Sequence, residues 1–165
     1  MYYFIKIHPT CITLLPNQLA PRVFDHDDLY VNVANTVASL CGPTNIILEK
    51  PYLSIQQDTL TPSAATRIAT SIIKTQRTYG ALVYAIQTTH PSTIIREISS
   101  AAVRSHLFPN TKKVSKDFLL NLVNAKYGTF KAGLSPIQEL CIADALLLQT
   151  FYESERDAFT HRNDD

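Results

Sequence analysis

The sequence predicts an α/β domain with a central mixed sheet of four or five strands and helices on both faces. Three observations support this. A strand, a helix and a second strand follow one another before residue 51, an order that implies parallel pairing through a right-handed crossover. A long segment rich in Ala, Ile and Thr then predicts a helix. The strand-like stretch STIIREIS precedes three further helical segments.

Length and composition predict one globular domain. The 165 residues suit a single core, expected over 1–160, with a frayed tail at 161–165. Hydrophobic residues make up 45% of the chain and charged residues 18%, which excludes a disordered or fibrous protein. The formal net charge is +1, so any nucleic-acid surface must come from local clusters of Lys and Arg.

The cysteines and the hydropathy pattern indicate the cellular compartment of the protein and whether it enters a membrane. Cys11, Cys41 and Cys141 are far apart and outside any CxxC spacing, which argues against a disulfide framework or a zinc knuckle. No apolar run approaches the roughly 18 residues of a membrane span, and the N-terminus lacks the order of a signal peptide. We expect a soluble intracellular protein without a membrane partner, in the cytoplasm or an organelle matrix.

The first third of the chain predicts a hairpin or bent strand, a helix and a strand. YYFIKIHPTCITLLP contains two β segments separated at HPT. After a loop from Pro16 to Pro21, Asp27 or Asp28 can cap a helix that Gly42-Pro43 ends. The apolar positions of this helix are Leu29, Val33, Val37 and Leu40. The strand NIILE follows directly.

The remaining segments carry clear helix-capping signals. Thr61-Pro62 opens a helix to about residue 87, within which Gly80 predicts close packing or a bend. SAAVRSHL predicts a short helix, and Ser115 caps a helix that runs to about residue 127. Ser135 and Gln138 form a capping box that opens the last helix.

Two carboxylates occur where an apolar pattern predicts burial. Glu49 ends the strand NIILE, and open α/β folds place ligand sites at the carboxyl ends of their strands. A solvated strand end is the alternative interpretation. Asp144 lies within CIADALLL, where an unpaired buried carboxylate would be costly, so it should face a polar pocket or a specific donor.

IILEKP and the late helical stretch IADALLLQ, in this order, resemble the RuvC family of Holliday junction resolvases. The resemblance includes YGALVYAIQ, STIIREIS, AAVRSHL and VSKDFLLNLV, and covers about residues 28 to 152. It implies an RNase H-like fold and an acidic cluster that holds two divalent ions, Mg²⁺ or Mn²⁺, at a phosphodiester of branched DNA. Glu49 matches the strand Glu of that cluster, and Asp144 matches its last helical Asp.

The sequence departs from the family pattern at two ligand positions. His8 stands where the family has an Asp, and Cys141 stands one turn before Asp144 where the family has an acidic residue or His. An imidazole or a thiol is a poor ligand for magnesium but suits a softer ion. His8 therefore remains a metal candidate beside Glu49 and Asp144, with an ordinary turn residue as the alternative; Cys141 is expected in the core. Glu139 points about 140° away from Asp144 around the helix and cannot substitute.

Four basic residues fall where the resemblance implies contact with the DNA backbone: Arg104, Lys112, Lys113 and Lys116. Lys116 is also near the active-site lysine of the family. An ordinary solvated face is the alternative interpretation.

Two functions therefore remain open. The first is a metal-dependent Holliday junction endonuclease, in which Glu49 and Asp144 hold the metals and Lys116 stabilises charge on the phosphate. The second is a non-catalytic protein that binds branched DNA or structured RNA, alone, as a homodimer, or as a structural subunit of a ribonucleoprotein or other nucleoprotein assembly. Loss of two of four ligand positions favours the second, because a positive surface can bind phosphates without metals. An unrelated α/β interaction module is a third, weaker alternative.

Overall fold

The computed structural model describes residues 1–17, 19–26, 29–51, 61–111, 114–128 and 133–161, the side chains of 157–161 excepted. The strands are β1 (Tyr2–Ile7), β2 (Cys11–Pro16), β3 (Arg22–Asp25), β4 (Asn45–Lys50) and β5 (Ile94–Ser99). The helices are α1 (Tyr30–Cys41), α2 (Pro62–Thr89), α3 (Ser100–Leu107), α4 (Lys116–Tyr127) and α5 (Pro136–His161). Among the described residues, no helix combines the length and apolarity that crossing a bilayer requires.

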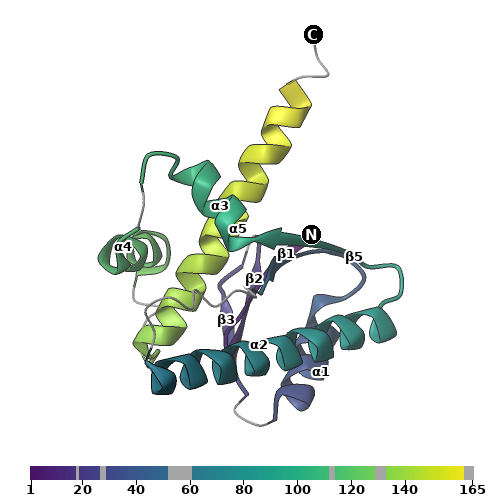
Figure 1. The fold of residues 1–165 in the computed structure, drawn as a ribbon. Coiled ribbons are helices and arrows are strands. Elements are labelled where there is room, and N and C mark those ends of the chain that lie inside the picture. Colours follow the sequence, from purple (N-terminus) through teal and green to yellow (C-terminus); the bar gives the residue numbers. More distant parts are fainter. Residues whose placement is uncertain (18, 27–28, 52–60, 112–113, 129–132, 162–165) are drawn as a thin grey trace.

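The five strands form one mixed sheet in the order β3-β2-β1-β4-β5 (Figure 1). β1 pairs antiparallel with β2 and parallel with β4, and β4 pairs parallel with β5. This confirms the predicted fold class and places the first strand beside the strand that carries Glu49. The carboxyl ends of β1, β4 and β5 therefore meet at one edge of the sheet.

Helices cover both faces of the sheet, as predicted, because successive strand residues point to opposite sides. Ile5 of β1 belongs to the core beneath α1 and α2, which includes Val37 and Leu82. Phe4 belongs to the core beneath α3, α4 and α5, which includes Ile142 and Leu148. The alternation of β1 therefore turns its even-numbered side chains toward α5.

The buried face of helix α1 matches the predicted one only in part, since Val37 is buried and Val33 packs against the core. Leu29 and Leu40, expected in the core, are exposed, whereas the buried residues are Ala34, Val37, Ala38 and Cys41. The periodicity of large apolar residues missed the rest of this face because small side chains line it opposite α2. Leu29 is the N-cap and its side chain makes no capping bond. The predicted caps Asp27 and Asp28 lie outside the described residues.

The capping signals of the later helices are confirmed. The hydroxyls of Thr61 and Ser115 accept hydrogen bonds from Ala64 N at 3.3 Å and Phe118 N at 3.2 Å. Ser135 and Gln138 form the reciprocal capping box of α5, at 2.7 and 3.3 Å. Strand β3 was not predicted, because its four residues RVFD are too short to show an alternating pattern. Of the expected frayed tail, only His161 is described, as the last residue of α5.

Gly80 lacks the close packing that was one of its two expected explanations, and this leads to a stability prediction. A β-carbon added to this exposed residue of α2 would meet no heavy atom within 4 Å, so close packing does not explain the glycine. Gly80→Ala should stabilise the fold by about 0.5–1 kcal/mol, because alanine loses less backbone freedom in a helix. The melting temperature should rise by about 1–4 °C in a calorimetric scan.

Gly128 provides the matched control because it also has open space around it but adopts a φ of 52°. Gly128→Ala should lower the melting temperature, since an L side chain is strained in the left-handed region. Equal effects of the two substitutions would contradict this account.

Candidate functional site

The carboxyl ends of β1 and β4 bring a lysine and a glutamate together. The parallel register pairs Ile5 with Leu48, so the next residues along the strands, Lys6 and Glu49, adjoin. Lys6 Nζ donates a hydrogen bond to Glu49 Oε1 at 2.7 Å. Glu49 is only 7% exposed although it ends its strand, so a solvated strand end does not describe it.

Helix α5 adds the second predicted carboxylate to the same point. Lys6 Nζ lies 3.3 Å from Asp144 Oδ2. Because one nitrogen contacts both acids, the two carboxylate oxygens lie at most about 6 Å apart. The structure thus brings together Glu49 and Asp144, which are far apart in the sequence. The group between them is Lys6, which the sequence analysis did not select.

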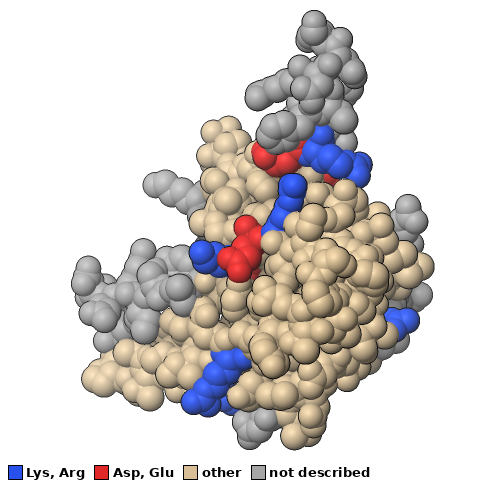
Figure 2. Space-filling model, turned by 90° about the vertical axis from the view of Figure 1, so that its right-hand side faces the viewer, with Lys and Arg blue, Asp and Glu red and all other residues tan. Residues whose placement is uncertain are grey.

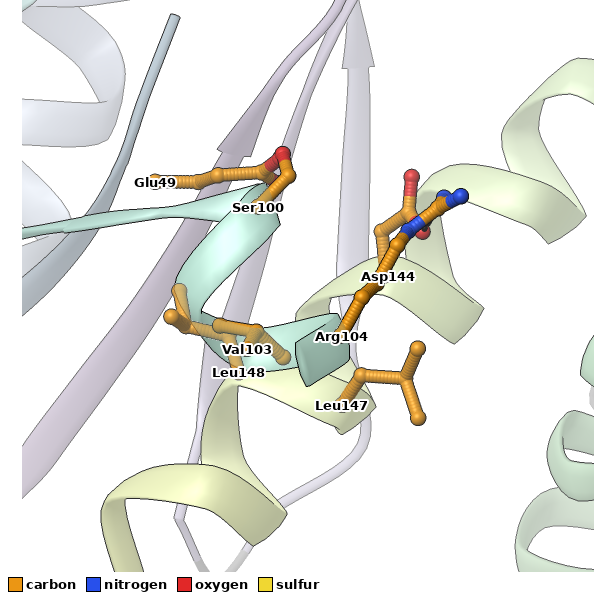
Figure 3. A pocket seen from close by; sticks show the side chains of 7 residues that line it. All are labelled: Glu49, Ser100, Val103, Arg104, Asp144, Leu147 and Leu148. Atoms are coloured by element: carbon orange, nitrogen blue, oxygen red, sulfur yellow. Dashed lines mark hydrogen bonds and ion pairs between the residues drawn. The ribbon is translucent and has the colours of Figure 1, made fainter. Parts of the chain in front are cut away.

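Helix α3 supplies two more polar side chains (Figure 3). Ser100 Oγ donates a hydrogen bond to Glu49 Oε1, and Arg104 Nη2 lies 3.5 Å from Asp144 Oδ1. Figure 3 shows Ser100 directed at Glu49, and Arg104 extended alongside Asp144. The cavity among these side chains measures about 10 Å³, room for about one water molecule. We call Lys6, Glu49, Ser100, Arg104 and Asp144 the lysine cluster.

The lysine cluster holds Lys6 in its charged form. Burial by itself lowers the pKa of Lys6, but the charges of Glu49 and Asp144 outweigh this effect and raise the pKa above its ordinary value. The ammonium group therefore persists at physiological pH. With Arg104, it gives the two acids two cationic partners, so the formal charge of the cluster is zero.

The residues present do not fit the two divalent ions that the fold implies. Two hard cations require several anionic oxygens, and Glu49 with Asp144 supplies only two carboxylates. Both carboxylates already contact Lys6, whose positive charge would repel a metal ion. His8, the third metal candidate, lines a neighbouring groove with Lys6 and Glu49. The donor set therefore suits an ammonium group and not a magnesium or manganese pair.

A signal for Lys6 was present in the sequence. In YYFIKI, alternation puts Lys6 on the same face of the strand as Phe4, which belongs to the core beneath α5. A charge on an otherwise apolar strand face requires a partner. The sequence alone could not show that the partner comes from both β4 and α5.

A second group of side chains lies beside the lysine cluster. The ligand atoms of His8, Cys11 and Cys141 all lie within 4.8 Å of one another, and the two sulfurs are 3.8 Å apart. The hydrogen bond between the two thiols lowers the pKa of Cys11 to about 5, burial opposes this, and a hydrogen bond with His8 adds to the lowering. The same contact between the thiols raises the pKa of Cys141, and burial raises it further. Cys11 was not a predicted site residue.

The predicted basic residues have different positions. Arg104 is about half exposed and contacts Asp144. Lys116 is exposed at the first turn of α4, and no contact among the described residues joins it to Glu49 or Asp144. Lys112 and Lys113 lie outside the described residues. On the face shown in Figure 2, the basic side chains form separate small groups, some against acidic ones, and not one continuous surface.

Comparisons with known proteins agree with this fold. The structure of Thermus thermophilus RuvC superposes with a TM-score of 0.56 at 14% identity, covering 93% of this chain and 95% of that one. T. thermophilus RuvC in complex with a Holliday junction substrate gives a TM-score of 0.56 at 13% identity, covering 93% and 94%. No protein-family model and no curated protein matches the sequence.

The chain therefore has a RuvC-like, RNase H-like fold, as the resemblance implied. At this level of identity the likeness concerns the fold alone. The chemistry of the site has to be argued from its own residues.

Proposed function

We propose that this protein binds branched nucleic acid, with four-way junction DNA as the first ligand to test, and does not cut it. The observation that carries the proposal is the Lys6 ammonium group between Glu49 and Asp144. It stands at the carboxyl ends of parallel strands, where open α/β folds place their ligand sites. An ammonium group there leaves the cluster with no net charge to repel a phosphate, but it cannot activate water as a metal ion does.

The charge balance of the lysine cluster supports binding of a nucleic-acid backbone without metal ions. Two unpaired carboxylates in a cleft would repel a phosphodiester, and in two-metal nucleases the divalent cations offset this repulsion as well as activating water. Here Lys6 and Arg104 neutralise Glu49 and Asp144 within the protein itself. A phosphate backbone can then approach the cleft without bringing two metal ions with it.

The surface beside the cluster has suitable chemistry. A groove of about 260 Å³ lies between the ends of β1 and β4 and helix α2, and Lys6 is among its lining residues. Ser71 of α2 adds a hydroxyl group to its wall, beside Thr75 and Ser100, whose hydroxyls already donate to Ser71 O and to Glu49. Hydroxyls and cations are the side chains that usually contact phosphate oxygens. The RuvC structure solved with a Holliday junction supports the choice of ligand.

The salt dependence of binding tests the proposal. If Arg104, Lys112, Lys113 and Lys116 contact phosphates, the logarithm of affinity should fall with log salt at a slope of about −3.6. Affinity for a labelled four-way junction should then drop about 150-fold between ~50 and ~200 mM salt. Replacing Lys112 and Lys113 with alanine should flatten the slope by about 1.8. Fluorescence anisotropy across a salt series measures all of these quantities.

A matched control removes two charges from elsewhere. Lys74 and Arg77 are exposed on α2 and do not line the groove, so Lys74→Ala with Arg77→Ala should leave the slope unchanged. An unchanged slope in the Lys112 and Lys113 variant would mean that these lysines belong to a solvated face. Tighter binding of structured RNA than of the junction, measured by competition, would move the proposal from DNA to RNA.

A further inference from the structure

We propose that His8, Cys11 and Cys141 form a binding site for one borderline transition-metal ion, with Zn²⁺ as the ion to test. This sulfur and imidazole site adjoins the lysine cluster but shares no residue with it, and its metal binding does not depend on the function proposed above. Thiolate and imidazole ligands select Zn²⁺ over Mg²⁺ and Mn²⁺.

The fold brings the three ligands together from two distant parts of the chain. His8 follows β1 and Cys11 begins β2, and the hydrogen bond from His8 N to Cys11 O at 2.9 Å closes the turn between them. Cys141 projects from α5, 130 residues along the chain from Cys11. The ligand atoms of all three lie within 4.8 Å of one another. An ion there would tie the β1–β2 turn to α5.

The sulfur separation agrees with tetrahedral zinc. Two sulfurs that each lie about 2.3 Å from one Zn²⁺, at a tetrahedral angle, are about 3.8 Å apart. The distance between Cys11 Sγ and Cys141 Sγ is 3.8 Å. A disulfide would require the sulfurs to approach to about 2.05 Å. Zinc can therefore bind with little movement of either cysteine.

The surroundings give the ion a buried side and an accessible side. Cys11 and Cys141 are 0% and 3% exposed, while His8 is half-buried and lines the groove. The ion can enter past the imidazole, and a water molecule or a fourth ligand from solvent completes the tetrahedron. Two thiolates cancel the charge of Zn²⁺, so the loaded site places no net charge in the core.

Groups around the ligands supply the outer contacts that such sites use. His8 Nδ1 lies 3.0 Å from Thr10 Oγ1 and accepts a hydrogen bond from Thr10 N at 3.3 Å. A metal ion bound at Nε2 requires the proton on Nδ1, which would then donate to Thr10 Oγ1 in place of accepting from Thr10 N. Asp25 lies opposite Cys11 in the sheet, and Gln138 holds its carboxylate with hydrogen bonds of 2.9 and 3.1 Å. This carboxylate places a negative charge outside the ligand shell.

Metal titration of the full-length reduced protein tests the site. We expect one equivalent of Zn²⁺ to bind in competition with a chromophoric chelator, and one equivalent of Co²⁺ to give a thiolate-to-cobalt charge-transfer band. Cys11→Ser and Cys141→Ser should each weaken Zn²⁺ binding by about 100-fold. Cys41→Ser is the matched control, because Cys41 is equally buried but lies on α1 outside the cluster. It should bind zinc as the unmodified protein does.

X-ray absorption of the zinc-loaded unmodified protein keeps the test independent of variant folding. Two sulfur ligands at about 2.3 Å and one imidazole nitrogen at about 2.0 Å are expected. Three results would overturn the proposal: no zinc binding by the reduced protein, unchanged affinity in a folded Cys11→Ser variant, or a zinc shell without sulfur. A Cys11–Cys141 disulfide in a protein whose reduced form binds no zinc would identify a redox pair instead.

Discussion

Replacing Lys6 with alanine should lower the melting temperature by about 4–12 °C, and Mg²⁺ or Mn²⁺ should restore part of that loss. Removing one member of a buried ion pair leaves charges without a partner and costs about 3–5 kcal/mol. We expect about 2–3 kcal/mol here, because the Lys6 and Asp144 side chains are 18% and 21% exposed and solvent screens part of the effect. For a chain of this length each kcal/mol corresponds to about 2–4 °C.

The metal response is the more specific part of this prediction. Without Lys6, Glu49 and Asp144 stay at most about 6 Å apart with no charge between them, an arrangement that a divalent ion can bridge. If the variant binds the metal ion with a dissociation constant of about 1 mM, ~10 mM metal should raise its free energy of unfolding by about 1.4 kcal/mol. The unmodified protein should show no such shift, because its ammonium group occupies the position.

Two control variants test whether the rescue by metal needs both the space that Lys6 vacates and the two carboxylates. Lys6→Met removes the charge but keeps the side-chain volume, so it should be destabilised without rescue by metal. Lys6→Ala combined with Glu49→Gln leaves one carboxylate and should also lose the rescue. Differential scanning fluorimetry over a metal series measures all three variants. Equal metal responses of Lys6→Ala and the unmodified protein would show that Lys6 does not occupy an ion position.

The unmodified protein should not cleave a four-way junction in Mg²⁺ or Mn²⁺, and three substitutions together should be needed to create a two-metal site. His8→Asp and Cys141→Asp restore acidic groups at the two positions where the sequence departs from the RuvC pattern. These two substitutions alone should not produce metal binding, because Lys6 still neutralises Glu49 and Asp144. Adding Lys6→Ala leaves four carboxylates for two hard cations, the number that a two-metal site uses.

Calorimetric titration with Mn²⁺ and a junction-cleavage assay are the two measurements. We expect no Mn²⁺ binding at millimolar concentration by the unmodified chain or the double variant, and binding by the triple variant. Asp144→Asn in the triple variant should remove it again. Metal-dependent cleavage by the unmodified protein that Asp144→Asn abolishes would overturn the proposed function and identify an active resolvase.

The sequence by itself determined the fold class and the two carboxylates of the candidate site, Glu49 and Asp144. Local signals sufficed for this: alternating apolar runs for the strands, hydroxyl caps at Thr61, Ser115 and Ser135, and a βαβ order that fixes parallel pairing. Glu49 and Asp144 could also be selected from the sequence, because a carboxylate at the end of an apolar strand, or within an apolar helix, is unusual.

Only the tertiary structure decided what Glu49 and Asp144 contact. Lys6 is 43 residues from Glu49 and 138 from Asp144, and Cys11 is 130 residues from Cys141. No local pattern encodes such pairs, because they depend on the register of β1 with β4 and on how α5 crosses the sheet. A one-residue slip of a strand would turn its side chains to the opposite face. The sequence therefore located a charged site, and the packing of α5 on the sheet made it a lysine-centred site and set two cysteines and a histidine beside it.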